Sequence, residues 1–436
     1  MITTANTDNH TQDSSSQNHH DQQDTNHVII IGGGQVGLSL ALLLAHQGIY
    51  STIIEQFAYP AISPDDDKHR AVYLDSRNTA LSRRTVQIYT EIGLWESMQS
   101  HACRIDGVEI SEVGGFGRAK LDKMAEGVES FGQVIENAWM GRQLLLAVQA
   151  SDFVCLIDDA SVVDIQQNDT SASVVFHKNG KTHCLWAPLV VACDGKDSIS
   201  RQILKVGIDT HDYGQVGIVG VVETDKPHQH IGIEKFSAVG PLAVLPLTDG
   251  RGDGVDGTTQ GYRRSVVFIC KVGEQKRYLE DDEYFKATLQ TVFGSDAGKF
   301  MAVGRRGAYP LSKVLAHRQV VGRCVIMGNA AHTLHPVAGQ GFNLCLRDAY
   351  ALANMLGANR RQNIDYDLGN FANLRAYEQA RQKDQKRVIR FCDTVVDSFS
   401  NANPMMKFAR NVGLVIFDKV PGIKPLVASY AMGLKS

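Results

Sequence analysis

The sequence predicts an α/β fold in which a parallel-sheet domain is interleaved with a β-rich domain and followed by C-terminal helices. A β-branched strand at 27–31 passes through glycines into an Ala/Leu-rich helix, and similar apolar strands recur near 188–193 and 323–328. Between the last two, strand-like segments dominate from about 214 to 299. Because the parallel strands are dispersed along the chain, we expect one domain built from separate segments, with the β-rich part inserted between them.

The first segment, HVIIIGGGQVGLSLALLLAHQGIYSTIIEQ at 27–56, contains the spacing Gly32-x-Gly34-x-x-Gly37 where a strand becomes a helix. Gly32 allows a tight turn, Gly34 lets the backbone approach a pyrophosphate, and Gly37 allows close packing of helix and strand. The free N–H groups of the helix then face the phosphates, and Glu55 closes the next strand, where it can bind a ribose. The segment predicts a Rossmann-like, dinucleotide-binding unit.

A second pattern with the same spacing stands at 252–257, between apolar residues 242–247 and the strand-like 265–272. No helix follows it, so we interpret it as a long hairpin loop. A calcium loop counted from Asp249 would place Gln260 where a bidentate Glu is needed. We therefore expect neither a nucleotide nor calcium at 252–257.

The composition is that of an ordinary globular protein, with 436 residues, 43% hydrophobic and 21% charged. A net charge of −3 without aromatic-plus-basic clusters argues against nucleic acid as a partner. The eight cysteines stand singly, without a C-x-x-C pair or zinc spacing, so we expect no metal site and a reducing, cytoplasmic environment.

Residues 1–26 are polar and almost lack apolar side chains, which predicts a disordered tail. Its histidines, among them His10, His19 and His20, are interpreted as solvated residues rather than metal ligands. The tail lacks the apolar stretch of a secretory signal, and the chain has no charge-free apolar run of ~18 residues that could span a bilayer.

The predicted organisation alternates two domains. It comprises a disordered tail at 1–26, nucleotide-binding segments at 27–106, 136–213 and 311–385, β-rich substrate-domain segments at 107–135 and 214–310, and a C-terminal helical region at 386–436.

Two more motifs follow the first. One is Cys193-Asp194-Gly195-Lys196-Asp197-Ser198, and the other is Gly328-Asn329-Ala-Ala-His332-Thr-Leu-His335-Pro336-Val-Ala-Gly339-Gln340-Gly341-Phe342-Asn343, which leads to Arg347-Asp348. With the first motif they resemble the single-component flavoprotein aromatic hydroxylases, over residues 27–436. Within that family, 329–348 together with 240–246 and 306–311 is similar to the ubiquinone-biosynthesis hydroxylases.

The resemblance implies FAD held non-covalently across the chain. Its expected contacts are Gly32, Gly34, Gly37, Glu55, Arg77, Arg142 with Gln143, Asp194, Asn329, Gly339, Gly341, Phe342 and Asn343. Residues 339–343 would bring backbone N–H groups and a helix N-terminus to the pyrimidine edge of the flavin, where negative charge gathers on reduction. Pro336, with His335 and Gly339, would lie beside the ring.

One position departs from the family, because most relatives have Asp where this chain has Asn329. An amide makes similar hydrogen bonds without charge, so FAD binding should survive. His332 and His335 could be acid–base groups, but we favour structural hydrogen-bonding roles, since a flavin hydroperoxide needs little side-chain chemistry. Arg347 and Asp348 are either an ion pair on a helix face or cofactor contacts.

The resemblance further implies hydroxylation of a prenylated phenol, with NADPH or NADH as reductant and O2 as co-substrate. The expected reaction is C1 hydroxylation of 2-polyprenyl-6-methoxyphenol; hydroxylation at another ring position, a prenyl-lipid reductase and a non-catalytic scaffold are the alternatives. A flavin halogenase is disfavoured because such enzymes tend to carry a W-x-W-x-I-P stretch. The three tryptophans of this chain instead stand far apart. Basic and apolar residues mixed in 386–436 predict peripheral contact with the inner face of the cell membrane or with other ubiquinone-biosynthesis proteins.

Overall fold

The computed structural model describes residues 26–62, 77–237, 239–248, 261–399 and 403–419. The tail expected at 1–26, apart from Asn26, and the glycine pattern at 252–257 lie outside these residues. So does the part of the predicted C-terminal region beyond Lys419.

The first sheet is the predicted parallel sheet, and it has six strands in the order β18-β19-β12-β1-β2-β8. Its members are β18 (Val320–Val321), β19 (Cys324–Ile326), β12 (Leu189–Ala192), β1 (His27–Ile31), β2 (Tyr50–Ile54) and β8 (Val154–Ile157). All neighbours pair in parallel except β18 with β19. Strands from the start, middle and end of the chain thus lie side by side.

Alternation along β1 sends its side chains into two different cores. Val28 and Ile30 pack with α1 (Gln35–His46), α4 (Asn137–Gln149) and α8 (Gln340–Gln362). Ile29 and Ile31 face a three-stranded antiparallel sheet of β9 (Ser161–Gln167), β10 (Ala172–Lys178) and β11 (Lys181–Ala187). Because both faces of β1 are covered, its sequence is continuously apolar.

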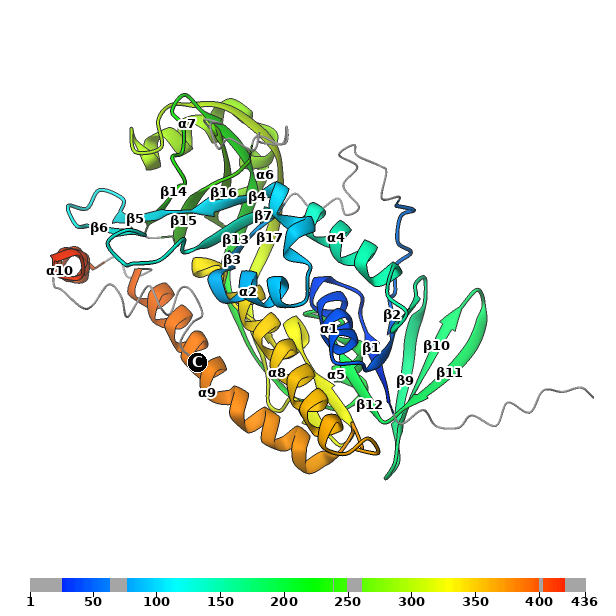
Figure 1. Ribbon diagram of the computed structural model, residues 1–436. Coiled ribbons are helices and arrows are strands. Elements are labelled where there is room, and N and C mark those ends of the chain that lie inside the picture. The colour runs from blue at the N-terminus through cyan, green and yellow to red at the C-terminus, as the bar shows by residue number, and fades with distance from the viewer. Residues whose placement is uncertain (1–25, 63–76, 238, 249–260, 400–402, 420–436) are drawn as a thin grey trace, which may run out of the picture.

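The β-rich domain is a sheet of eight strands in the order β20-β17-β13-β16-β15-β14-β5-β6. They are β20 (His332–Thr333), β17 (Phe300–Ala316), β13 (Ile208–Thr224), β16 (Arg263–Lys271), β15 (Pro241–Pro246), β14 (Ile231–Phe236), β5 (Gly107–Glu112) and β6 (Arg118–Asp122). Pairing is antiparallel except between β14 and β5. Helix α7 (Asp282–Phe293) covers this sheet with Phe285, Leu289 and Phe293, as Figure 1 shows.

The predicted boundaries at 214 and 310 fall inside single strands, because β13 starts at Ile208 and β17 continues to Ala316. The remaining elements lie outside the three sheets described so far. They are β3 (Asn78–Ser82), β7 (Gly132–Glu136) and β4 (Ala102–Ile105), which form a small sheet, the helices α2 (Arg83–Glu91), α3 (Trp95–Met98), α5 (Ile199–Ile203) and α6 (Gln275–Glu280), and the 3-10 turns η1 (Gln99–His101), η2 (Gly328–Ala330) and η3 (Val337–Gly339).

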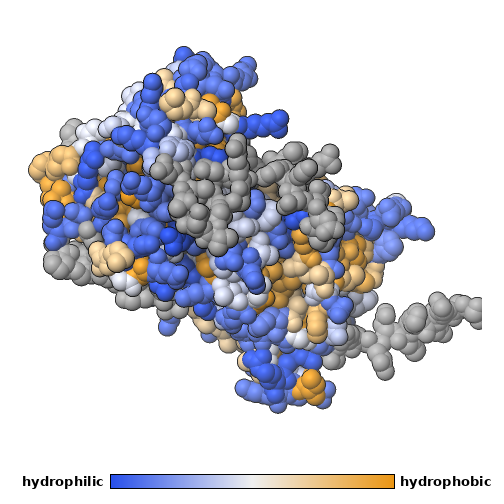
Figure 2. Space-filling model, turned by 45° about the horizontal axis from the view of Figure 1, so that its top comes forward, coloured by the Kyte–Doolittle hydropathy of each residue, from blue (hydrophilic) through white to orange (hydrophobic). Residues whose placement is uncertain are grey.

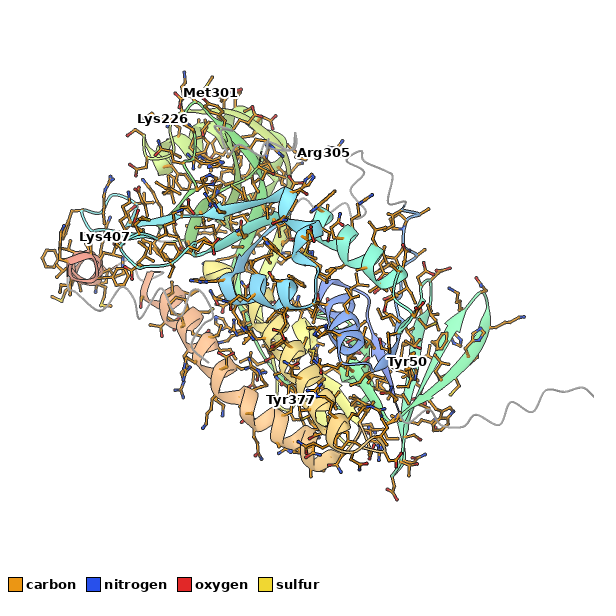
Figure 3. All side chains as sticks on the ribbon, viewed as in Figure 1. Tyr50, Lys226, Met301, Arg305, Tyr377 and Lys407 are labelled. Carbon is orange, nitrogen blue, oxygen red and sulfur yellow. The ribbon has the colours of Figure 1, made fainter. Side chains whose placement is uncertain are left out.

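Two helices end the described chain. Helix α9 (Phe371–Phe399) runs beside α8, and α10 (Pro404–Lys419) lies at the far end of the substrate sheet against β5 and β6 (Figure 1). Tyr377 of α9, marked in Figure 3, donates a hydrogen bond to the carbonyl of Asp348 in α8 at 3.1 Å. In the described part of the chain, no helix has both the length and the hydropathy needed to cross a bilayer.

Candidate active site

The N-terminus of α1 presents bare backbone. Its N-cap is Gly34, which provides no side-chain cap, and a Cβ added there would meet nothing within 4 Å. The flanking glycines are instead enclosed, since a Cβ on Gly32 would lie 2.6 Å from the carbonyl oxygen of Cys193 and one on Gly37 2.0 Å from that of Gly32. Gly32 also has φ +98°. The helix end therefore has free N–H groups and open space, which suits a phosphate.

Glu55 closes β2 beside this helix end. Its Oε2 accepts a hydrogen bond from the Gly33 N–H at 2.6 Å, and its Oε1 accepts one from the Phe57 N–H at 3.0 Å. Tyr59 donates to the carbonyl of Gly33 at 2.5 Å. The sequence reasoning missed Tyr59, because nothing in the glycine pattern indicates which residue of the following loop returns to it.

The second motif, which starts at Cys193, forms the turn that leads into α5 and contacts the third motif. Asp194 accepts hydrogen bonds from the Ser198 hydroxyl at 2.5 Å and the Ser200 N–H at 2.9 Å. Arg201, buried in α5, donates to the carbonyl of Ala330 at 2.9 Å and to that of Lys196 at 2.8 Å. Asp194 thus holds the turn after β12, and Arg201 fixes that turn against η2.

A second uncapped helix end starts α8. Its N-cap is Gly339, with φ +61°, and a Cβ added at Gly341 would meet nothing within 4 Å. Asn343 holds this turn. Its amide donates to the carbonyls of Gly339 at 2.7 Å and Ala80 at 2.8 Å, and its oxygen accepts from the Ser82 N–H at 2.8 Å and the Thr85 hydroxyl at 2.7 Å. Asn343 is therefore placed to shape the backbone of this site.

The other predicted contacts lie on several different elements. Arg142 is buried on α4, where its guanidinium lies 5.6 Å from the Trp139 ring centroid, and Phe342 packs on the main core. Asn329 is exposed on η2. Arg77 is exposed, lies 4.9 Å from the Tyr309 ring centroid, and lines a cavity of about 480 Å³ beside the substrate sheet.

His332 belongs to a buried ionic network. Its Nε2 lies 2.8 Å from Asp348, which also accepts from Arg381 at 2.5 Å and Gln385 at 2.9 Å. Burial opposes charge on the ring, but Cys345 and the bond to Asp348 outweigh it and raise the pKa of His332 to about 10. His332 is thus engaged within the protein.

Of the two alternatives for Arg347 and Asp348, an ion pair between them on a helix face is excluded by this network. Both side chains are buried, and Arg347 donates to Asp384 of α9 at 3.0 Å, whereas the recorded partners of Asp348 are His332, Arg381 and Gln385. On a helix, adjacent residues point in different directions, so each reached its own partner.

His335 bridges the two domains. It is 1% exposed, and its Nε2 lies 3.2 Å from the Oε1 of Gln215 on β13. Burial lowers the pKa of His335 to about 4. Pro336, the next residue, is exposed beside it.

Cys103, His228 and His230 are the one group of described residues with metal-ligand spacing, their ligand atoms lying within 4.8 Å of one another. His228 accepts the His230 N–H on Nδ1 at 3.0 Å, and its Nε2 lies 3.0 Å from the carbonyl of Leu247. A neutral imidazole has one lone pair, so these two bonds use both nitrogens and leave none for a metal.

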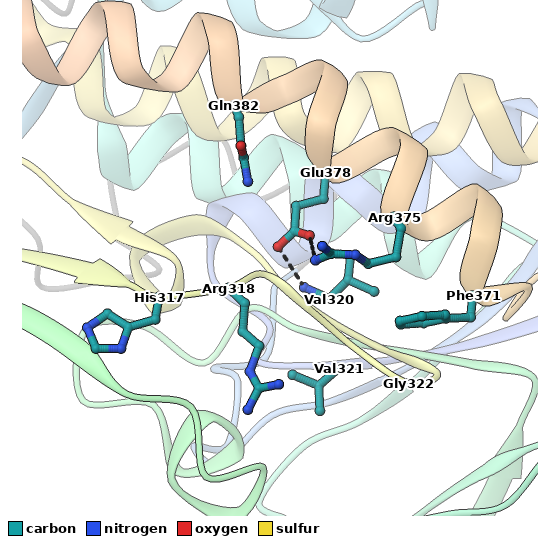
Figure 4. Close-up of a pocket in the computed structure, with 9 residues that line it drawn as sticks. All are labelled: His317, Arg318, Val320, Val321, Gly322, Phe371, Arg375, Glu378 and Gln382. Atoms are coloured by element: carbon teal, nitrogen blue, oxygen red, sulfur yellow. Dashed lines mark hydrogen bonds and ion pairs between the residues drawn. The ribbon is translucent and has the colours of Figure 1, made fainter.

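A surface cavity of about 610 Å³ lies between α9 and the segment at 317–322, around Glu378, as Figure 4 shows. Glu378 accepts from the Gln319 N–H at 2.6 Å and the Val320 N–H at 3.3 Å, so it serves to hold this segment on α9. The residues lining this cavity belong to none of the three motifs.

Comparisons with known proteins agree with this geometry. The profile of the FAD binding domain family matches residues 25–392. Ubiquinone hydroxylase UbiL of Rhodospirillum rubrum is 30% identical over 403 residues, covering 92% of this chain and 88% of that protein. The 3-demethoxyubiquinol 3-hydroxylase of Escherichia coli is 28% identical over 407 residues, covering 92% and 97%.

Two solved structures share the fold. The p-nitrophenol 4-monooxygenase PnpA of Pseudomonas putida has a TM-score of 0.74 at 18% identity, covering 92% of this chain and 96% of that one. Klebsiella pneumoniae HpxO complexed with FAD and uric acid has a TM-score of 0.70 at 18% identity, covering 94% and 97%.

The FAD binding domain profile and the ubiquinone hydroxylase relatives, together with the uncapped helix ends at Gly34 and Gly339, define the class of this protein as an FAD-dependent aromatic monooxygenase. The chain belongs to the FAD binding domain family, and within it to the FAD-dependent hydroxylases of ubiquinone biosynthesis. The expected fold class and the expected class of enzyme are confirmed.

Proposed function

We propose that this protein hydroxylates a 2-polyprenyl-6-methoxyphenol at the ring carbon para to its hydroxyl, which is C1 in ubiquinone numbering, to give the 2-polyprenyl-6-methoxy-1,4-benzoquinol. The choice of position rests on the likeness of 328–336 and 391–410 to 2-octaprenyl-6-methoxyphenol hydroxylase. UbiL and the 3-demethoxyubiquinol 3-hydroxylase support the ubiquinone precursor as the substrate class. The runner-up activity is hydroxylation at another position of the same ring.

The observation that carries the proposal is the pair of uncapped glycine N-termini at Gly34 and Gly339, which fit the two polar parts of FAD. We assign the pyrophosphate to α1, with Glu55 on the adenosine ribose, and the pyrimidine edge of the flavin to α8. Arg77, Arg142, Asp194 and Asn329 are proposed to complete the site. Neither helix has an acidic residue in its own first turn, where it would oppose a bound anion.

Bound FAD, held non-covalently, would supply the redox chemistry, with NADPH or NADH as reductant and O2 as the oxygen source. The protein's task is to orient the phenol and to exclude water. Any phenol is activated ortho and para to its oxygen, so orientation decides the product. We expect the ring to lie at the exposed Pro336, next to the buried His335–Gln215 bridge.

We also propose that the protein reaches its substrate at a membrane surface. Met405, Met406, Phe408, Val415 and Ile416 are exposed on α10 beside Lys407 and Lys419, and Figure 2 shows apolar side chains at that end of the molecule. An amphipathic helix of this kind suits anionic lipid.

The test of the function is reduction of the purified yellow protein by NADPH or NADH without oxygen, followed by air and 2-methoxy-6-prenylphenol. We expect a product with one added oxygen para to the hydroxyl, identified by mass spectrometry and NMR. An ortho product would replace the C1 assignment with the runner-up, and reduction without any oxygenated product would overturn both.

A further inference from the structure

His335 differs from His332 in the hydrogen bonding of its two ring nitrogens. The Nε2 of His335 meets Gln215, but its Nδ1 is buried and has no hydrogen-bond partner within the described residues. Burying an acceptor without a partner is unfavourable, so such an atom in a native site indicates a place for a ligand donor.

The hydrogen bonds around Gln215 decide which nitrogen of His335 carries the proton. The Gln215 amide nitrogen donates to the carbonyl of Val239, which turns the amide oxygen toward His335. An oxygen there accepts, so Nε2 carries the hydrogen and Nδ1 of the neutral ring is left with its lone pair. The low pKa of His335, caused by burial, keeps the ring neutral at ordinary pH.

The backbone of β13 is irregular beside His335, at the position of Tyr213. The pairing of β13 with β17 shifts between Asp212 and Gln215, and Gly214 has φ +62°. Bulges of this kind redirect side chains near active sites. Here the bulge turns Tyr213 edge-on to the His335 ring, with centroids 4.9 Å apart and planes at 85°.

Tyr213 adds a second polar atom next to the His335 ring. Its hydroxyl is also buried and lacks a hydrogen-bond partner among the described residues. Burial, together with the carboxylates of Asp393 and Asp397 and the Cys392 thiol, raises the pKa of Tyr213, so the hydroxyl keeps its proton and can donate. An acceptor without a partner, the Nδ1 of His335, and a donor without a partner, the hydroxyl of Tyr213, thus lie on two rings that contact each other.

We infer that the Nδ1 of His335 accepts the hydroxyl hydrogen of the phenol and thereby sets which ring carbon faces the flavin. The inference rests on the proposed function and deepens it. A phenol is held at two points when its O–H is bonded to one acceptor and its prenyl tail is bound. The ring then has little freedom to turn, so a single acceptor can select which ring carbon is hydroxylated. Tyr213 packs against the His335 ring and holds its plane. His335 is then a substrate-binding residue rather than a purely structural one.

The test measures binding without turnover. 2-Methoxy-6-prenylphenol and its O-methyl ether, which lacks the donor, are titrated against the FAD-bound protein by the change in flavin absorbance. The wild-type protein should bind the phenol about tenfold more tightly than the ether, which is the worth of one well-made hydrogen bond. The preference should disappear in His335→Gln and persist in part in His335→Asn, because the Asn amide reaches the Nδ1 position and the Gln amide does not.

The two His335 variants are similar in size and polarity, so a general loss of folding would affect both. His211→Asn is the control, because His211 is exposed and contacts Tyr213 on another side, 4.8 Å between ring centroids; its preference should equal that of the wild type.

Equal binding of phenol and ether by the wild type, or an unchanged preference in His335→Gln, would overturn the inference. A preserved phenol preference in a protein that forms no oxygenated product would instead overturn the proposed function. In turnover, His335→Gln should still consume NADPH but release hydrogen peroxide in place of product.

Discussion

Gly34 differs from its neighbouring glycines in the open space that it faces. Its neighbours Gly32 and Gly37 are required by contacts inside the protein, whereas Gly34 faces open space at the end of α1. Under the proposed function, a glycine is needed at this position only to make room for the bound cofactor.

We expect Gly34→Val to leave the fold intact but to weaken FAD binding by more than about tenfold, because a branched side chain would fill the pyrophosphate position. FAD retained after gel filtration is the measurement. Gly254→Val, in the second glycine pattern, should retain FAD as the wild type does. Equal losses in the two variants would mean that the sequence patterns had been wrongly distinguished.

His332 provides a prediction on pH. Its pKa in the folded protein, about 10, lies above the ordinary value of about 6.5. The charged ring therefore stabilises the fold fully below about pH 6.5, and this contribution is lost as the pH rises toward 10. The melting temperature of His332→Gln should fall well below that of the wild type near pH 6 and approach it near pH 10. A gap that widens with rising pH would contradict the assignment.

Helices α8 and α9 are joined by buried charge as well as by apolar packing. Arg381 of α9 lies 2.5 Å from both Asp348 and Asp384, and all three side chains are at least 90% buried. Removing one member of such a network leaves the others charged without compensation.

Arg381→Met should accordingly lower the free energy of unfolding by about 3–5 kcal/mol, measured by urea denaturation. Lys383→Met is the matched control, since Lys383 is exposed on the same helix, and it should change stability by less than about 0.5 kcal/mol. An Arg381 variant as stable as this control would show that the two carboxylates find other partners.

For the whole molecule, the position of α10 bears on the proposed contact with a membrane surface. The helix is anchored on β5 by Asn411, which donates to Glu112 at 2.6 Å, and by Arg410, which donates to the same carboxylate at 2.5 Å. Its exposed apolar face is therefore held in a fixed orientation relative to the substrate sheet. Lys407, marked in Figure 3, lies on the same helix.

We expect the protein to float with liposomes containing anionic lipid and to be released by salt, because screening weakens attraction at distances beyond about 8–10 Å. The double variant Met405→Ser/Phe408→Ser should reduce flotation several-fold. Met301→Ser, at an exposed residue labelled at the top of Figure 3 and outside α10, should not. Unchanged flotation in the double variant would remove α10 from the contact surface.

Local patterns in the sequence were enough to predict the first βαβ unit, the apolar strands near 188–193 and 323–328, and the helix that follows Gly339. Turn glycines, strand alternation and helix starts are set by interactions between residues close in the chain, which is why these segments could be recognised.

The pairing of distant segments was decided only in the tertiary structure. The sequence motif contained His332, His335, Arg347 and Asp348 without distinguishing their roles, because those roles depend on α9 and β13. Arg347 and Asp348 separate toward different partners on α9, and His335 meets Gln215 across 120 residues of chain. A hydrogen bond depends on positions in space, and for residues so far apart only the packing of whole elements fixes those positions.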